Sequence, residues 1–320
     1  MLSSVLFCLY LDGLLSLLAK SGVGCLVGEC YVGALAYADD IVLLAPTANA
    51  MRHMLKLCDI YASDYTMYVF NASKSKCIFV QSCHDIASSF GPKSEFFIGG
   101  NLLEYVKQWP HLGHIVTDSL EDAADIASRR NSLCGQINNL LCYFGKLGNV
   151  TKQSLIFLFC TNFYGSDLWD LGNPSVQDFC IAWRKGLKRV WGLPYTMHCD
   201  LLPVLANTIP ILDELHRRTA NFINNCPSSK CRVVQAIARH GVYFGLMKSP
   251  IGRNVFQCCS RYGVRLLAIS EVTTFLINKF VHNNINEELV WKANLILELI
   301  FLKDRSYCQG HYSIVLILIA

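Results

Sequence analysis

The chain has 320 residues, of which 52% are hydrophobic and 16% are charged, and its formal net charge is +4. An average globular protein has roughly 25% charged residues, so this composition excludes a disordered chain and predicts a large buried core. The length suffices for about two domains of ordinary size. Because the net charge is small, a nucleic-acid-binding surface would have to come from a local cluster of basic residues.

The 16 cysteines are scattered, mostly inside apolar runs, and form no Cys-x-x-Cys pair. A chain of this size needs no disulfide framework, and a buried thiol behaves as a small hydrophobic group. The apolar stretch 1–19 contains Asp12 and has no basic residue before it, which argues against a signal peptide and against a membrane span. We therefore expect an intracellular protein, in the nucleus or the cytoplasm, with reduced cysteines and no membrane partner.

The first hundred residues predict a mixed region of helices and strands. Residues 5–19 carry apolar side chains at helical spacing and predict a buried helix. Two short runs rich in Val, Ile, Leu and Tyr follow at 31–37 and 41–46 and predict a β-hairpin. A second, amphipathic helix comes next, with Thr47 or Asn49 as its N-cap. Further strands are expected at 66–70, 77–80, 95–98 and 103–106.

Helical patterns dominate after about residue 117. Helices are predicted over 120–147, 151–164 and 175–192, with Gly148 ending the first of them. Beyond these helices the signals weaken. The sequence thus predicts three regions: a mixed α+β region at 1–117, a helical region at 118–255, and a weakly defined tail at 256–320.

Two adjacent aspartates, Asp39 and Asp40, stand between the strands of the predicted hairpin. Burying two like charges is costly unless a counter-ion is present. Two divalent cations held about 4 Å apart by carboxylates can activate a hydroxyl nucleophile and stabilise a leaving pyrophosphate. A solvated Asp-Asp turn is also common, so these two residues alone leave a metal site and an ordinary surface turn open.

The surrounding residues resemble the catalytic hairpin of reverse transcriptases, in the run Gly33-Ala-Leu-Ala-Tyr-Ala-Asp-Asp-Ile-Val-Leu-Leu-Ala45. Three further segments resemble motifs of the non-LTR (LINE-type) retrotransposon enzymes. They are Leu2-Ser-Ser-Val-Leu-Phe7 with Tyr10-Leu-Asp12, similar to the end of QG-x-LSP-LF-x-x-YLD; Phe70-Asn-Ala-Ser-Lys74-Ser-Lys76, similar to FNxxKS; and His111-Leu-Gly-His-Ile115, similar to a (Y/H)LG hairpin. The four motifs stand in the family's order, and the resemblance covers at least residues 2–117.

The resemblance implies an RNA-directed DNA polymerase that works by two-metal nucleotidyl transfer. Asp39 and Asp40 match the carboxylates that bind Mg²⁺ (or Mn²⁺), and Tyr37 and Ala38 match positions that pack near the primer end. Lys74 would approach the triphosphate, although a solvated lysine beside a turn is an equal alternative.

The resemblance also implies a fold and a set of partners. Leu112 and Gly113 would form the bend that contacts the primer, where a glycine permits close approach of the backbone. The expected fold is α+β: a partial polymerase palm, followed by a mainly α-helical thumb-like region. The implied partners are an RNA template, a DNA primer and deoxynucleoside triphosphates, and no obligate protein partner is inferred.

Several departures from the family pattern bear on activity. The family requires a third aspartate from an earlier palm strand and a fingers region, and the sequence starts after both. Ser4 stands where the family has proline, and the usual apurinic-type endonuclease is not found. We therefore expect a fragment that is inactive as given. The alternative is a non-catalytic remnant that at most binds nucleic acid.

The predicted helix 175–192 combines an apolar and a basic side. At 100° per residue, the apolar side carries Trp183, Leu187, Val190 and Trp191. The opposite side is basic and carries Arg184, Lys185, Lys188 and Arg189. Such a helix would dock on the core and offer four cations to template–primer phosphates, or present an ordinary solvated basic face.

Overall fold

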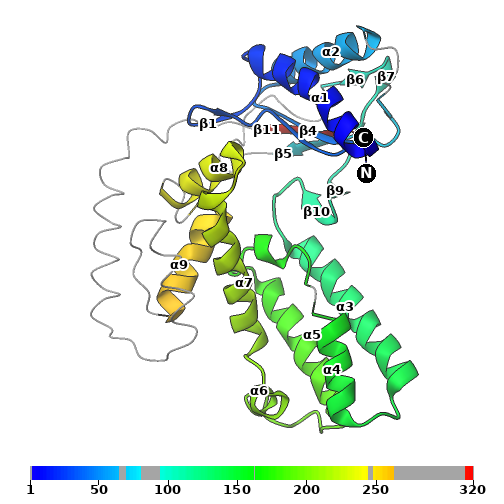
Figure 1. Ribbon diagram of the computed structural model, residues 1–320, viewed down its shortest axis with the longest axis vertical. Helices are drawn as coiled ribbons and strands as arrows, with labels where there is room; N and C mark the ends of the chain where they lie inside the picture. Colours follow the sequence, from blue (N-terminus) through cyan, green and yellow to red (C-terminus); the bar gives the residue numbers. More distant parts are fainter. Residues whose placement is uncertain are drawn as a thin grey trace. The chain divides into compact units, whose positions relative to one another are not determined.

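The computed structural model describes residues 2–64, 70–80, 94–161, 163–243, 248–262 and 314–319. The fold class is mixed α+β, and the chain divides into two compact units, Met1–Glu121 with Lys303–Ala320, and Asp122–Leu302 (Figure 1). Within the described ranges, no helix is both long enough and apolar enough to cross a membrane. Most of the strand predicted at 66–70 lies outside the described residues.

The first unit is built on a five-stranded mixed sheet with the strand order β3-β4-β11-β5-β8. Its strands are β3 (Ala34–Tyr37), β4 (Asp40–Ala45), β11 (Ile314–Ile319), β5 (Lys76–Val80) and β8 (Glu104–Tyr105). Neighbouring strands are antiparallel except β5 and β8, which are parallel. The central strand, β11, comes from the far end of the chain.

Helices α1 (Leu2–Lys20) and α2 (Ala48–Asp64) cover one face of this sheet (Figure 1). Residues of α2 such as Met51 pack against every second residue of the strands, because alternate side chains point to the same face. The predicted first helix is confirmed, but its described side chains are buried on one side only. Leu11, Leu14 and Leu18 face the core, whereas Leu9 is 68% exposed.

A hairpin of β9 (Gln108–His111) and β10 (His114–Thr117) covers the other face. Its Trp109 and Val116 pack on the cluster formed by Val42, Ile78, Val80 and Leu318. The sheet is therefore apolar on both faces. Two small ribbons complete the unit: β1 (Leu26–Val27) with β2 (Cys30–Tyr31), and β6 (Phe97–Ile98) with β7 (Asn101–Leu102). Tyr31 thus belongs to a separate ribbon and not to the predicted hairpin.

The described part of the second unit is helical. Its elements are α3 (Ala123–Phe144), α4 (Asn149–Phe159), η1 (Ser166–Leu168), α5 (Pro174–Trp191), α6 (Leu201–Ala206), α7 (Ile211–Asn225), η2 (Cys226–Ser228), α8 (Arg232–Tyr243) and α9 (Pro250–Tyr262). The three predicted helices are confirmed with shifted ends: the first ends before Gly145 and not at Gly148, and the second ends at Phe159. Helix α9 runs unbroken through the boundary predicted between 255 and 256.

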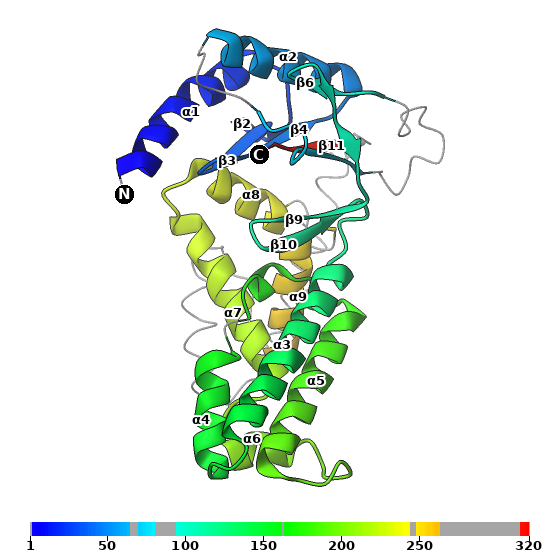
Figure 2. The same cartoon turned by 90° about the vertical axis from the view of Figure 1, so that its right-hand side faces the viewer.

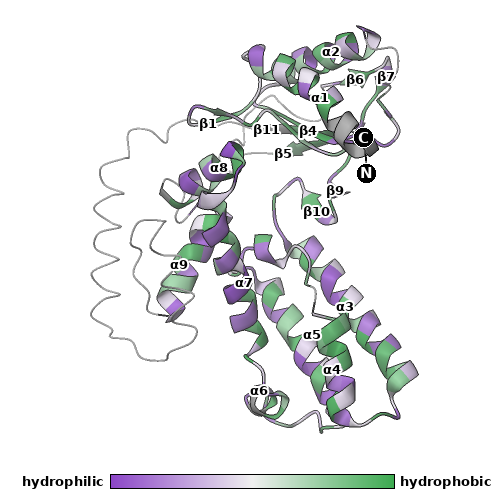
Figure 3. Cartoon of the chain, viewed as in Figure 1, coloured by the Kyte–Doolittle hydropathy of each residue, from purple (hydrophilic) through white to green (hydrophobic). Residues whose placement is uncertain are grey.

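Helices α3, α4 and α5 lie side by side (Figure 2), and polar and apolar residues alternate along them (Figure 3). Asn173 caps α5 by accepting a hydrogen bond from the Ser175 N–H at 3.0 Å, and Gly192 ends the helix in the left-handed conformation. Helices α3 and α5 approach closely at Gly186, where an added Cβ would lie 2.5 Å from the Ile137 side chain. Glycine at this position therefore permits the close packing.

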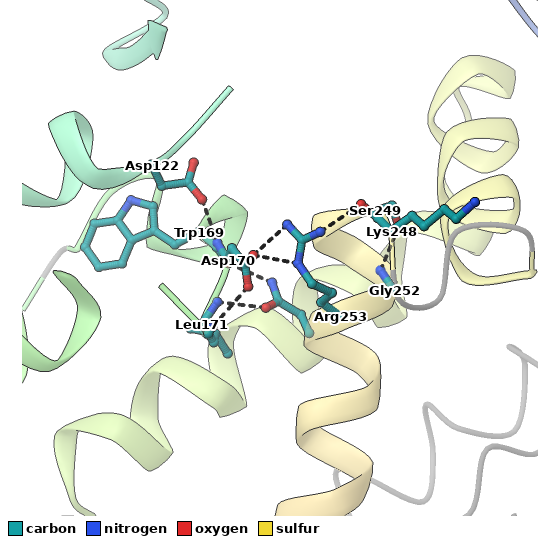
Figure 4. A network of polar contacts seen from close by, with 10 residues as sticks. Asp122, Trp169, Asp170, Leu171, Lys248, Ser249, Gly252 and Arg253 are labelled. Carbon is teal, nitrogen blue, oxygen red and sulfur yellow. Dashed lines mark hydrogen bonds and ion pairs between the residues drawn. The ribbon is translucent and has the colours of Figure 1, made fainter. Parts of the chain in front are cut away.

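A polar network joins α9 to the segment after η1 (Figure 4). The buried amide of Asn254 donates to the Trp169 carbonyl at 2.7 Å and accepts from the Leu171 N–H at 2.8 Å. Beside it, Arg253 forms an ion pair with Asp170 at 2.6 Å, in a more exposed position. Asn254 thus satisfies two backbone groups that would otherwise be buried without partners.

We expect Asn254→Ala to destabilise the protein by about 2–4 kcal/mol, because it leaves both backbone groups unpaired. The matched change Arg253→Ala removes a partly exposed ion pair and should cost about 1 kcal/mol or less. Urea unfolding followed by tryptophan fluorescence measures both. Equal losses would show that the buried amide is not what holds α9 in place.

Candidate functional site

The paired carboxylates lie at the turn of the β3–β4 hairpin, which is confirmed over Ala34–Ala45. Tyr37 pairs with Asp40 across the hairpin, so Ala38 and Asp39 form the two-residue turn. Ala38 has a φ of 52°, a left-handed conformation that costs a non-glycine residue on the order of 1 kcal/mol or more. Asp39 is exposed at the tip and Asp40 is half-buried at the first position of β4.

Strand alternation places Asp40 on the face of the sheet that the β9–β10 hairpin covers. Asp40, Val42 and Leu44 occupy alternate positions of β4, and Val42 and Leu44 belong to the cluster that packs against Trp109. His111 of this second hairpin lies close enough to interact electrostatically with Asp40. Burial lowers the pKa of His111, and the Asp40 carboxylate partly opposes that effect. Two motifs some seventy residues apart in the sequence are therefore neighbours in this unit.

The turn of the second hairpin is formed by Leu112 and Gly113, between the paired residues His111 and His114. Their φ values are 46° and 75°, so both are left-handed, as in the type I′ turns that suit tight hairpins. Glycine adopts this conformation freely, but leucine does not. Both candidate hairpins thus hold one strained non-glycine residue at the tip.

Lys74 lies in the turn that leads into β5. Asn71 shapes this turn by accepting hydrogen bonds from the Lys74 N–H, at 3.1 Å to its carbonyl and 3.3 Å to its side chain. Because β4 and β5 both run antiparallel to β11, their first residues lie at the same end of the sheet. Lys74 is exposed at that end. Since β11 lies between β4 and β5, two strand spacings put the backbone of Lys74 about 10 Å from that of Asp40.

A different lysine of the same motif is structural. Lys76 is buried, donates to the Ser73 carbonyl at 2.9 Å and to Glu104 at 2.8 Å, and lies over the Trp109 ring at 5.3 Å. It therefore connects β5, β8 and the β9–β10 hairpin. The ammonium group of Lys76 is therefore engaged by contacts within this unit.

Asp39 and Asp40 offer oxygen ligands of the kind that Mg²⁺ and Mn²⁺ prefer. Two carboxylates at an accessible tip fit such an ion as part of a shell, which water and substrate phosphates would complete. In the ranges that the structure describes, no group of three His, Cys, Asp or Glu side chains could hold a metal ion. The pair would therefore supply two protein ligands, with no third among the described residues.

Only some of the four cations predicted on the basic side of α5 are exposed to solvent. Lys188 is 6% exposed, and its ammonium donates to the carbonyls of Tyr195 at 2.9 Å and Met197 at 2.5 Å. The prediction that all four cations face outward is wrong for Lys188, because the loop after the helix folds back over it. Arg184 is half-buried, whereas Lys185 and Arg189 are exposed.

A groove of about 460 Å³ runs between α3 and α5, with three cations in its lining: Arg130, Lys185 and Arg189. Arg189 also donates to Asn138 of α3 at 2.5 Å, which holds it across the groove. Among the described residues, neither Arg130 nor Lys185 has an ion pair or hydrogen bond, and one carboxylate, Asp178, also lines the groove. Sequence reasoning missed Arg130, although it shares a face of α3 with Cys134 and Asn138 at four-residue spacing.

No family model matches the chain, and no curated protein matches it significantly. The resemblance to non-LTR reverse transcriptases therefore rests on the four short motifs.

The contact between the two hairpins predicts a specific change in titration. Asp40→Asn should lower the pKa of His111 further, because it removes the negative charge that favours the imidazolium. Asp39→Asn, at the exposed tip, is the matched control and should have a smaller effect. NMR titration of the imidazole measures both. An unchanged pKa of His111 in the Asp40 variant would show that the two hairpins do not interact electrostatically.

The α3–α5 groove predicts salt-dependent binding to nucleic acid. Replacing Arg130, Lys185 and Arg189 together by Gln should reduce the log–log salt slope for a primer–template duplex by roughly 2–3, at about 0.7–0.9 per phosphate contact. The control variant changes three exposed cations elsewhere in the same unit: Lys230, Arg232 and Arg239. Equal salt slopes for the two variants would show that the groove is an ordinary solvated surface and does not bind the duplex.

Proposed function

We propose that the chain derives from the reverse transcriptases of non-LTR retrotransposons and that Asp39 and Asp40 correspond to their metal-binding pair. The proposal is supported mainly by one observation: the Asp-Asp turn and the His111-Leu-Gly-His114 turn, matched independently in the sequence, are neighbours in the first unit. In the family, these motifs hold the metal ions and the primer end. The finer assignment of the first unit as a partial polymerase palm is part of this proposal.

The residues present define what each part contributes. Asp39 and Asp40 would hold Mg²⁺ or Mn²⁺, and the bound ions would supply charge stabilisation for phosphoryl transfer. The strands behind the turn keep both carboxylates fixed. The Leu112–Gly113 turn offers an accessible backbone for the primer, while the exposed ammonium of Lys74 lies at the same end of the sheet for a triphosphate. Tyr37 is 68% exposed beside Asp40 and is available to pack against a primer terminus.

We further propose that the 320-residue chain by itself does not polymerise DNA. Nucleotidyl transfer requires the nucleophile, the phosphate and the metal ions in line, and a small misplacement costs orders of magnitude in rate. Two carboxylates hold this arrangement more loosely than three. The alternative function is non-catalytic binding of nucleic acid, which is favoured by Arg130 and Lys185 in the α3–α5 groove, two cations that have no ion pair with any described residue.

We expect the purified chain to bind Mn²⁺ at the carboxylate pair without extending a DNA primer on an RNA template. Paramagnetic broadening of the His111 resonances measures the binding, because the ion would lie close to that ring. Asp39→Asn and Asp40→Asn should abolish the broadening, and Asp64→Asn, an exposed carboxylate at the end of α2, should not.

Primer extension with Mg²⁺ is the second measurement, with an active reverse transcriptase as the positive control. Incorporation that disappears in Asp39→Asn would contradict inactivity and show that a third ligand is supplied from elsewhere in the chain. Mn²⁺ that broadens His111 equally in all variants would show that Asp39 and Asp40 do not bind the ion, and would contradict their assignment as the metal-binding pair.

A further inference from the structure

The α3–α5 groove combines an apolar floor with charged edges. Ile137 and Gly186 are buried and form its floor, whereas Lys185 and Arg189 are exposed at its edge. Ile181, which also lines the groove, is 39% exposed and offers an apolar side chain to solvent. A ligand in this groove would therefore contact apolar surface as well as cations.

The three cations of the groove are separated by distances that follow from helix geometry. Lys185 and Arg189 are one turn apart on α5, about 6 Å along the axis at 1.5 Å per residue. Arg189 is held to Asn138 of α3, and Arg130 lies eight residues before Asn138, about 12 Å along that helix. One carboxylate, Asp178, also lines the groove. The line of cations has room for up to roughly three nucleotide steps, since phosphates of one strand lie about 3.4 Å or more apart.

An exposed aromatic ring lines the same groove. Tyr195 is 67% exposed, and its carbonyl accepts a hydrogen bond from the buried ammonium of Lys188 at 2.9 Å. The same ammonium donates to the Met197 carbonyl, so the loop is held on both sides of Thr196. A ring on an anchored loop offers a flat surface and has little conformational freedom to lose on binding.

We propose that the α3–α5 groove binds single-stranded nucleic acid, with phosphates along Arg130, Lys185 and Arg189 and a base stacked on Tyr195. A groove of cations that follows the backbone, combined with an aromatic ring for stacking, binds single strands with little sequence preference. The bases of a duplex are enclosed in the stack, so a duplex would reach the cations but not the ring. The inference rests on the alternative function, non-catalytic binding of nucleic acid, and is independent of descent from a polymerase.

Lys188 is a positioning residue in this arrangement. It does not line the groove, but its two hydrogen bonds place the loop that carries Tyr195. Lys188→Met keeps most of the length of the side chain and removes both bonds. We expect this variant to bind a single strand more weakly and a duplex as before, whereas a purely structural role would weaken both.

Fluorescence anisotropy of the full-length chain with two probes tests the proposal. The probes are a labelled oligothymidylate of roughly 12 nucleotides and the duplex that it forms with its complement. The wild-type chain should bind the single strand more tightly at equal salt. Tyr195→Ala should lower the single-strand affinity about 5- to 150-fold, the equivalent of one lost base stack, and leave the duplex affinity unchanged.

Two matched variants serve as controls. Tyr195→Phe keeps the ring and should bind the single strand like the wild type. Tyr143→Ala removes a tyrosine that is 83% exposed near the end of α3 and does not line the groove, and it should change neither affinity.

The outcomes separate this inference from the function on which it rests. Single-strand binding that is unchanged in Tyr195→Ala would overturn the stacked single strand, and so would equal losses for the two probes. If the duplex still binds and loses affinity when Arg130, Lys185 and Arg189 are all changed to Gln, non-catalytic binding of nucleic acid is retained without the stacked base. A wild-type chain that binds neither probe would overturn both.

Discussion

The alternation of side chains along β4 determines which residues of the strand face the helices and which face the β9–β10 hairpin, and so where Asp40 lies. Ile41, Leu43 and Ala45 face the helices, and Val42 and Leu44 face the β9–β10 hairpin. Because both faces are buried, a shift by one residue would exchange the two apolar rows and is strongly disfavoured. The same constraint fixes Asp40 at the start of the strand, on the side where His111 lies. A packing requirement thus determines the electrostatic environment of the site.

The sequence predicted those parts of the fold whose signals are local. The hairpin at Ala34–Ala45 and the helix α5 follow from short-range periodicity, turn chemistry and capping residues, which a single segment contains. The central position of β11 depends on pairing across the whole chain and has no local signal. The sequence predicts a weakly defined tail at 256–320 and no strand at Ile314–Ile319.

The candidate site shows the same division. The Asp39–Asp40 turn was predicted from its own residues and the Leu112–Gly113 turn from the family resemblance, whereas the proximity of the two turns depends on the sheet between them. Lys188 was wrongly predicted to face solvent, because a helical wheel describes one helix and omits the loop that covers this side chain. A buried ammonium held by two carbonyls is the outcome expected of a lysine that a loop encloses.

The placement of β11 has a consequence for synthesis of the protein on the ribosome. The other strands of the sheet are made by residue 105, and β11 follows only after roughly 200 further residues. At about 5–20 residues per second, the edges of β4 and β5 stay without their partner for roughly 10–40 s. During that time two apolar edges are open to other nascent chains. Newly made chains are therefore most prone to aggregate before residues 314–319 emerge, and chaperones that cover strand edges would act in that interval.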